Sequence, residues 1–327
     1  MCGLFGLARP TGAASPRAGT RALLKLGRLA EERGVDAAGL GFWPSTGNPP
    51  NRLVTGIDGT LDGWRVVKRT GPFGELSLRG ARTGLDAARI VLGHTRHATQ
   101  GDPDRLANAS PLAVGPLLGT HNGDVTAEVL RERYPWLDPA GETDSELIFG
   151  ALADATRTAT GGATGTGTGT ATRTATGGAG TGARDEAAIL DVLSGLEGRA
   201  ALAWVDRRDP HRLWLARAAL SPLAVAVTVD GALFWASNPD WLRRVARSCG
   251  LTFRGRGPAL VPEGTLLAFD VGDRVRHAGS ASFVPQHRSS DLALTWAIWR
   301  GFNAADRAAD QAALHSMTSP AAQPVAA

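Results

Sequence analysis

Short apolar segments separated by turn residues run through most of the chain and limit the folds open to it. Segments of this length, bounded by Gly, Pro, Asp and Asn, are typical of β-strands. Because such segments are many and long helical patterns are few, we predict stacked sheets with helices on the outside. The predicted strands are 90–92, 117–120, 200–205, 212–216, 223–229, 232–236 and 265–271.

Helical periodicity is confined to a few stretches. In the first, Leu23, Leu26 and Leu29 share one face, and Gly34 is the expected C-cap. In the last, Trp296, Trp299 and Phe302 would form one stripe, which either packs on the parent domain or binds a partner. The predicted helices are 16–33, 144–155, 185–196 and 291–302.

A tract over residues 156–183 consists almost entirely of Thr, Gly and Ala. It lacks the bulky apolar side chains that offset ordering entropy, so we predict a disordered surface insertion. Because predicted helices flank it on both sides, we interpret it as a loop inside one domain. The expected organisation is one domain over residues 2–285 and a C-terminal helix and tail over residues 286–327.

Composition and charge exclude several classes of protein. The formal net charge is only +4 although the sequence pI is about 9.8, and the arginines are scattered, so no nucleic-acid partner is expected. The longest apolar stretch is interrupted by Asp230, which argues against a membrane span. The N-terminus lacks the regions of a secretory signal, so we expect a cytoplasmic protein.

Cys2 directly follows the initiator methionine. A small second residue normally permits removal of that methionine, which would leave a cysteine with both a thiol and a free α-amine. Since an α-amine titrates near about 8, a neutral fraction can accept the thiol proton and activate the sulfur as a nucleophile. The other cysteine, Cys249, is interpreted as a packed thiol, because two cysteines are too few for a disulfide framework.

Two polar clusters follow predicted strands. Arg96 carries a planar guanidinium that can bind a carboxylate through two parallel hydrogen bonds, although it could also form a surface ion pair. Asn122 and Gly123 combine an amide donor with a residue that permits close backbone approach, as an oxyanion hole requires. Asn-Gly is also a common hairpin turn, so this pair has a purely structural alternative.

A third cluster opens the helix predicted at residue 144. Thr143 and Glu146 match a capping box, which puts Asp144 in the first turn, where the helix dipole favours the ionised carboxylate. Such a carboxylate could hold a substrate ammonium, although acidic residues in first turns are usually structural. A metal site is an alternative role for His94, His97 and His121. No carboxylate or thiol completes a set of metal ligands in this part of the sequence, so we expect no metal site.

In order and spacing, these motifs resemble the glutaminase domain of class II, N-terminal-nucleophile (Ntn) glutamine amidotransferases. The similarity is strongest to glucosamine-6-phosphate synthase and looser to amidophosphoribosyltransferase. It implies an α+β fold, the four-layer αββα sandwich of Ntn hydrolases, and hydrolysis of L-glutamine to glutamate and ammonia with no cofactor. The motifs that carry it are residues 2–6, 33–40, 94–96, 121–123, 143–146, 215–217 and 221–223.

The resemblance implies the catalytic roles. Cys2 is the nucleophile with its α-amine as the base, and Asn122 and Gly123 donate hydrogen bonds to the oxyanion. Arg33, in the motif after the first helix, braces the region around the nucleophile.

The resemblance also implies the substrate contacts. Arg96 binds the α-carboxylate of glutamine with support from Thr99, and Asp144 binds the α-amino group. His97 stands where the similar synthases usually have tryptophan, and Ser110 where they often have histidine. We therefore expect the substrate to be shielded differently.

The fate of the ammonia is left open by the sequence. In the synthases that this chain resembles, a second catalytic domain consumes it, and few residues follow the matched region here. We expect a separate synthase or acceptor subunit as the partner. The alternatives are a free-standing glutaminase, an Ntn amidase acting on another amide, and a non-enzymatic regulator with the same fold.

Overall fold

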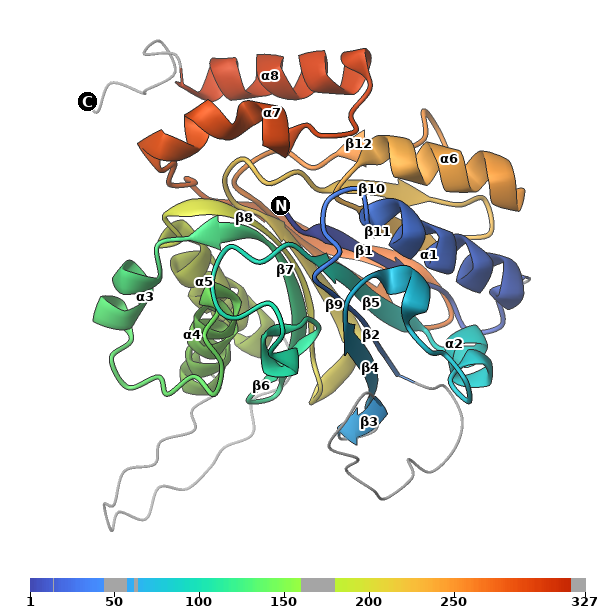
Figure 1. Cartoon of the computed structure of the whole chain (residues 1–327), viewed down its shortest axis with the longest axis horizontal. Coiled ribbons are helices and arrows are strands. Elements are labelled where there is room, and N and C mark those ends of the chain that lie inside the picture. The colour runs from blue at the N-terminus through green and yellow to red at the C-terminus, as the bar shows by residue number, and fades with distance from the viewer. Residues whose placement is uncertain (14, 44–57, 62–63, 160–179, 319–327) are drawn as a thin grey trace.

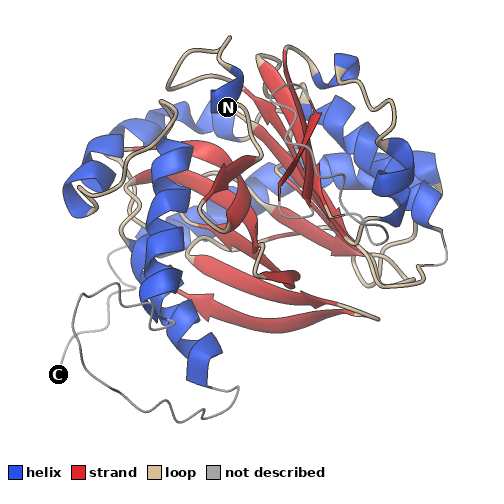
Figure 2. Ribbon diagram, turned by 90° about the horizontal axis from the view of Figure 1, so that it is seen from below, coloured by secondary structure: helices blue, strands red, loops and turns tan. Residues whose placement is uncertain are grey.

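A computed structural model describes residues 1–13, 15–43, 58–61, 64–159 and 180–318 of the chain (Figure 1). In these residues, two antiparallel sheets face each other and helices cover both outer faces (Figure 2). The predicted α+β class and four-layer αββα sandwich are confirmed. None of the described helices combines the length and the apolar character that crossing a membrane requires.

The first sheet has β1 near its centre, so the residue before β1 is held by strands on both sides. β1 pairs with β11 on one edge and with β5 on the other, both antiparallel. The strand order is β12 (Ala259–Leu260), β10 (Ala224–Val227), β11 (Leu233–Ala236), β1 (Gly3–Ala8), β5 (Ile90–Arg96), β2 (Ala37–Phe42), β4 (Trp64–Thr70) and β3 (Asp58–Leu61). Its outer face is covered by α1 (Pro16–Ala30), α2 (Arg82–Ala87) and α6 (Pro239–Cys249).

The second sheet carries β7 next to its edge, facing β5 of the first sheet. The strand order is β14 (Val275–Ser282), β13 (Thr265–Val271), β9 (Asp209–Arg217), β8 (Gly198–Asp206), β7 (Leu117–Val125) and β6 (Leu112–Val114). The helices on its outer face are α3 (Ala127–Arg133), α4 (Asp144–Ala159) and α5 (Gly180–Ser194).

Alternating apolar side chains explain why β1 lies inside the sandwich. Leu4 and Ala8 join the apolar cluster between the two sheets, whereas Phe5 and Leu7 join the cluster beneath the helices of the first sheet. All four side chains are fully buried. Because successive side chains of a strand point to opposite faces, this pattern fits only a strand covered on both faces.

The predicted strand ends were wrong at both polar clusters. β5 continues through His94, Thr95 and Arg96, and β7 continues through Asn122 and Gly123. These residues pair in register with neighbouring strands, so Asn-Gly forms no hairpin turn here. The prediction ended each strand where its apolar residues end. The polar side chains that follow are nevertheless buried inside the sandwich, where hydrogen bonds take the place of apolar contacts.

Gly34 does not cap the first helix, as the sequence had suggested. The helix ends at Ala30, and Gly34 does not adopt a left-handed backbone conformation. Instead, a Cβ at residue 34 would lie 2.5 Å from the carbonyl carbon of Arg96. The position therefore requires glycine for close approach to the end of β5.

Both ends of the Thr/Gly/Ala tract are helical. α4 continues to Ala159 and α5 begins at Gly180, whereas the sequence predicted helix only to residue 155 and from residue 185. Thr156 is buried, and its hydroxyl donates to Leu152 O at 3.0 Å. The rest of the predicted insertion, residues 160–179, lies outside the described residues.

The C-terminal segment packs over the first residues of the chain. It contains a 3₁₀ helix (Ser289–Leu294), α7 (Thr295–Ile298) and α8 (Ala304–Thr318). Trp299 and Phe302 are buried against a cluster that includes Met1, whereas Trp296 is 73% exposed. The predicted three-residue aromatic stripe is therefore split, because the short α7 turns Trp296 outward. Figure 1 shows α7 and α8 above the N-terminus.

Candidate active site

Cys2 precedes the central strand β1 and is almost completely buried. Its thiol donates to His97 O at 3.5 Å, and the His97 N–H lies 3.4 Å from Sγ as a donor. Burial raises the pKa of the Cys2 thiol, while the adjacent terminal amine and the His97 hydrogen bond act to lower it. A base beside the sulfur is therefore needed to generate the thiolate near neutral pH.

The N-terminal amine lies in a buried and positively charged environment. Burial lowers the pKa of the Met1 amine to about 6, and the charges of Arg33, Arg199 and Arg300 also lower it, although Cys2 acts in the opposite direction. An amine with this pKa is mostly neutral at pH 7. It can therefore accept a proton.

Arg33 binds the backbone of Cys2 from outside the pocket. Its Nε donates to Cys2 O at 3.0 Å, and its Nη1 donates to Ile298 O at 2.9 Å in the C-terminal segment. Burial lowers the pKa of Arg33 to about 10, which still leaves it charged. Arg33 does not line the pocket in front of Cys2, so its contacts fit a bracing role better than contact with a substrate.

A narrow pocket opens in front of Cys2. Six of the residues predicted for the catalytic and substrate-binding roles line it: Cys2, Arg96, His97, Thr99, Gly123 and Asp144. Seven others line it as well: His94, Gln100, Asn108, Ser110, His121, Thr143 and Ser145. Residues from β5, β7 and the start of α4 thus meet at one site.

Arg96 is a buried cation with an unusual set of partners. It is 4% exposed, and its guanidinium donates to the backbone oxygens of Gln100, Gly101 and Asp102 at 2.7 to 3.1 Å. Among the described residues, no carboxylate lies within ion-pair distance of it. Burying an uncompensated charge is costly, so an anion in this pocket would be stabilised by Arg96.

Asp144 begins α4 with both carboxylate oxygens engaged by backbone donors. Oδ1 accepts from Ser145 N at 2.8 Å, and Oδ2 accepts from Val125 N at 2.9 Å. The predicted capping box is wrong, because Thr143 Oγ1 finds no partner among the described residues and Glu146 accepts from Ala140 N and Gly141 N instead. A carboxylate oxygen has two lone pairs, so Asp144 keeps the capacity to accept from a ligand.

Gly123 presents its backbone to the pocket through the geometry of β7. His121 O accepts from His94 Nε2 at 2.9 Å, and Val125 N donates to Asp144 on the pocket side. Because alternate residues of a strand direct their N–H and C=O groups to the same edge, the Gly123 N–H lies on that edge too. A Cβ at residue 123 would overlap Arg199 O and His121 Nε2, which explains the glycine.

Asn122 points to the opposite face of β7, into the space between the sheets. Its Nδ2 donates to Ser237 Oγ at 3.3 Å, and Ser237 Oγ also accepts from Leu4 N at 3.0 Å. The Asn122 amide is thus tied to the strand that follows Cys2, but Asn122 does not line the pocket. Its second amide hydrogen is not committed to any described residue.

His97 and Thr99 belong to the loop that leaves β5 and covers the pocket. Ala98 N donates to Asp36 Oδ2 at 2.8 Å, which fixes the start of this loop. The His97 side chain is 54% exposed, and its Nδ1 lies 3.9 Å from Asp36 Oδ2. Burial and the terminal amine lower the pKa of His97, although Asp36 acts to raise it. His97 is therefore uncharged at neutral pH.

The side chains of His94 and His121 are engaged in hydrogen bonds. Burial lowers the pKa of His94 to about 3, and His121 Nδ1 lies 2.9 Å from Ser145 Oγ. Across the part of the chain that the structure describes, no three His, Cys, Asp or Glu side chains form a group suited to a metal ion.

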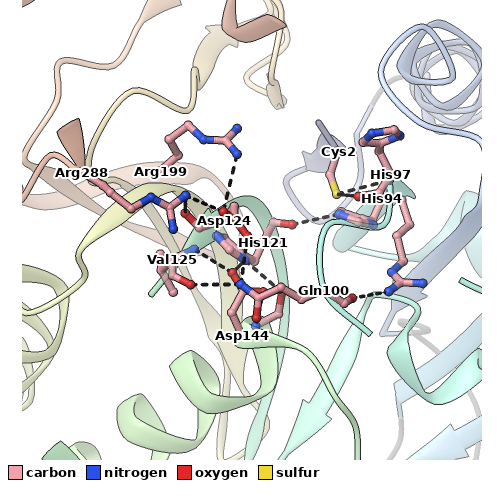
Figure 3. A network of polar contacts seen from close by, with 12 residues as sticks. Cys2, His94, His97, Gln100, His121, Asp124, Val125, Asp144, Arg199 and Arg288 are labelled. Atoms are coloured by element: carbon pink, nitrogen blue, oxygen red, sulfur yellow. Dashed lines mark hydrogen bonds and ion pairs between the residues drawn. The ribbon is translucent and has the colours of Figure 1, made fainter. Parts of the chain in front are cut away.

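A charged network that the sequence did not predict adjoins the pocket, with Arg199 and Asp291 buried and Asp124 and Arg288 partly exposed (Figure 3). Asp124 accepts from Gln100 Nε2 at 2.9 Å and from Arg288, and Arg199 lies 3.8 Å away. Burial acts to raise the pKa of Asp124, but the hydrogen bonds from Arg288 and Gln100 hold it below its usual value. Asp291 pairs with both arginines. No local sequence pattern reveals this network, because its members come from distant segments.

Comparisons with known proteins identify the fold but assign no family. No family model matches the chain, and no curated protein sequence matches it. The solved structures similar to this chain include the glutamine phosphoribosylpyrophosphate amidotransferase of B. subtilis in complex with ADP and GMP, and the allosteric regulatory enzyme of purine biosynthesis. Their TM-scores are 0.53 and 0.54, at 18% sequence identity in both cases.

These matches cover 86% of this chain but only 49% of each solved chain, so this chain spans about half the length of either. At this identity, the similarity shows a shared fold and no more. The specific likeness to glucosamine-6-phosphate synthase that the motifs had suggested stays a prediction.

Proposed function

We propose that this chain is a class II glutamine amidotransferase domain that hydrolyses L-glutamine through a thioester on Cys2. One observation carries the proposal: a single pocket combines the Cys2 thiol, the buried and uncompensated guanidinium of Arg96, and the carboxylate of Asp144. These groups match the carboxamide, the α-carboxylate and the α-ammonium of free glutamine. The fold shared with solved amidotransferases supports the same assignment.

In the proposed reaction, Met1 is removed and the neutral α-amine of Cys2 takes the thiol proton. The thiolate attacks the carboxamide carbon, and the carbonyl oxygen becomes an oxyanion. The Gly123 N–H and the Asn122 Nδ2 are the proposed donors to it. The protonated amine then gives its proton to the leaving nitrogen, so ammonia departs and a γ-glutamyl thioester remains. Water attacks the thioester, which releases glutamate and restores the thiol.

Purified protein provides the test of this function. Intact mass should show a chain that begins at Cys2, and this protein should release glutamate and ammonia from glutamine. The Cys2→Ala variant should fold and be inactive, and 6-diazo-5-oxo-norleucine should label Cys2 and not Cys249. A folded chain that begins at Cys2 and releases no glutamate from glutamine would contradict the proposal.

We further propose that the ammonia passes to a separate acceptor enzyme, and that residues 286–327 are appended to an amidotransferase domain formed by residues 2–285. Trp296 is exposed on the same short helix that ends at Ile298, whose carbonyl oxygen binds Arg33 behind the nucleophile. An acceptor docked there would contact the nucleophile region indirectly. Its addition should raise glutamine turnover, whereas turnover that is already high without it would favour a free-standing glutaminase.

A further inference from the structure

Gln100 has an amide whose orientation is fixed by its neighbours. Its Nε2 donates to Asp124 Oδ1 at 2.9 Å and to Val125 O at 3.1 Å, as Figure 3 shows. Both partners are oxygen acceptors, so the nitrogen end of the amide must face them, and both of its hydrogens are used. Gln100 also lines the pocket in front of Cys2, and no described residue donates to its Oε1. The carbonyl end of the amide is therefore left for a ligand.

The position of Gln100 next to Asp144 indicates which part of a ligand it would meet. The backbone of Val125 connects the two residues, because Val125 N donates to Asp144 Oδ2 and Val125 O accepts from Gln100. A carbonyl oxygen beside the carboxylates of Asp124 and Asp144 attracts a cation and repels an anion. The guanidinium of Arg96 binds the backbone oxygen of Gln100 and marks the opposite, anion-binding side.

From these contacts, and resting on the proposed glutaminase function, we propose that Gln100 determines specificity for an α-amino acid. Its Oε1 accepts one N–H of the substrate α-ammonium, and Asp144 accepts another. Asp124 acts as a positioning residue, because its carboxylate keeps the nitrogen end of the Gln100 amide turned away from the substrate.

The C-terminal segment stabilises this arrangement. Arg288 binds Asp124 directly, and it also donates to Asp291 Oδ1 at 3.0 Å. Asp291 in turn accepts from Arg199 Nε at 3.1 Å. With two arginines near it, Asp124 stays ionised and can act only as an acceptor for Gln100. Residues far along the chain thus set the orientation of a side chain in the pocket.

The test compares two substrates, glutamine and glutaramate, which has hydrogen in place of the α-amino group. For Gln100→Met, kcat/KM for glutamine should fall about tenfold, mainly through KM, because one hydrogen bond to a charged group is lost. The kcat/KM of the same variant for glutaramate should stay within about twofold of the wild-type value. The selectivity ratio, which is kcat/KM for glutamine divided by kcat/KM for glutaramate, therefore also falls about tenfold. Gln286→Ala is the control, since Gln286 is exposed and its side chain bonds only Ser194 O among the described residues.

A second variant tests the positioning residue. Asp124→Asn introduces an amide that can donate to Gln100 Oε1, so the Gln100 amide can turn over and the selectivity ratio should fall as it does in Gln100→Met. Gln100→Ala replaces Gln100→Met if the latter does not fold. If wild type hydrolyses glutamine and a folded Gln100 variant keeps the wild-type ratio, the inference is overturned while the proposed function stands. If wild type hydrolyses neither substrate, the proposed function itself has failed.

Discussion

The guanidinium of Arg217 forms two hydrogen bonds with the carboxylate of Asp310, at 2.8 and 2.9 Å. Both side chains are buried, and the pair connects the end of β9 with α8 near the end of the described chain. The carboxylate of Asp310 also accepts from Trp299 Nε1 at 2.9 Å. The C-terminal segment is thus attached to the sandwich by buried charge as well as by apolar contacts.

Asp310→Asn should destabilise the protein markedly. It leaves Arg217 buried with only Glu263, whose carboxylate is 3.5 Å away, to offset the charge. Breaking one side of a buried ion pair typically costs about 3 kcal/mol or more in the free energy of unfolding. The control lies on the same helix: Asp306→Asn breaks a pair with the partly exposed Arg243 and should cost less than about 1 kcal/mol. Denaturant unfolding of both variants measures the difference, and equal costs would contradict it.

Removing residues 160–179 and joining α4 to α5 with a short Gly/Ser linker should change the melting temperature little. The free energy of closing a loop varies slowly with its length, and the two helices already pack against each other. Removing residues 156–183 instead should lower the melting temperature further, because it cuts into both helices and deletes the buried Thr156. Thermal melts of the two deletions compare the boundaries directly. Equal melting temperatures would show that the helix ends contribute nothing.

The proposed catalytic base, the N-terminal amine, should titrate below the usual value for an α-amine. Burial, with help from three arginines, lowers the pKa of the Met1 amine to about 6. Cys2 is the next residue and is buried, so we expect a similar lowering for its own α-amine once Met1 is removed. Since only the neutral amine accepts the thiol proton, kcat/KM should rise with a midpoint near about pH 6 and level off by about pH 7. A midpoint near about pH 8 would show an amine that is not perturbed.

Substitution of Arg300 tests how nearby positive charge affects the pKa of the N-terminal amine. Arg300 is exposed and its positive charge lowers the pKa of the amine. In Arg300→Gln that effect is lost, so the pKa and the midpoint of the pH profile should move upward by a fraction of a unit. An unmoved midpoint would mean that the charge of Arg300 does not act on the group that the pH profile reports.

The sequence predicts the site where its residues form short contiguous motifs and fails where distant segments meet. Cys2, Arg96, Gly123 and Asp144 each lie in a local motif, and the pocket contains all four. Gln100 could not be assigned, because its role depends on Asp124 from another strand. A glutamine in a polar loop gives no signal until its partners are known.

The same limit applies to the fold. The strand 265–271 was predicted to the residue, because alternation and turn signals are local. The helical ends of the Thr/Gly/Ala tract were missed, because Thr, Gly and Ala show no apolar periodicity there. Packing of α4 against α5 stabilises helix where propensity alone would not, and the buried Thr156 hydroxyl is satisfied by the carbonyl of Leu152 in the preceding turn.

Arg96 and Asp144 should respond differently to substitution, although the resemblance assigns both to binding the substrate. Asp144→Asn keeps its size and can still accept from Val125 N, so only the charge opposite the substrate ammonium is lost. Its main effect should be a KM for glutamine raised by a factor of about ten or more, with kcat little changed.

Arg96→Ala removes a carboxylate receptor and also three hydrogen bonds to the loop of Gln100, Gly101 and Asp102. Because that loop covers the pocket and follows the His97 backbone that contacts the Cys2 sulfur, kcat should fall together with the rise in KM. Steady-state kinetics on both variants separates the two roles, and an unchanged kcat in Arg96→Ala would show that the loop keeps its position without the guanidinium.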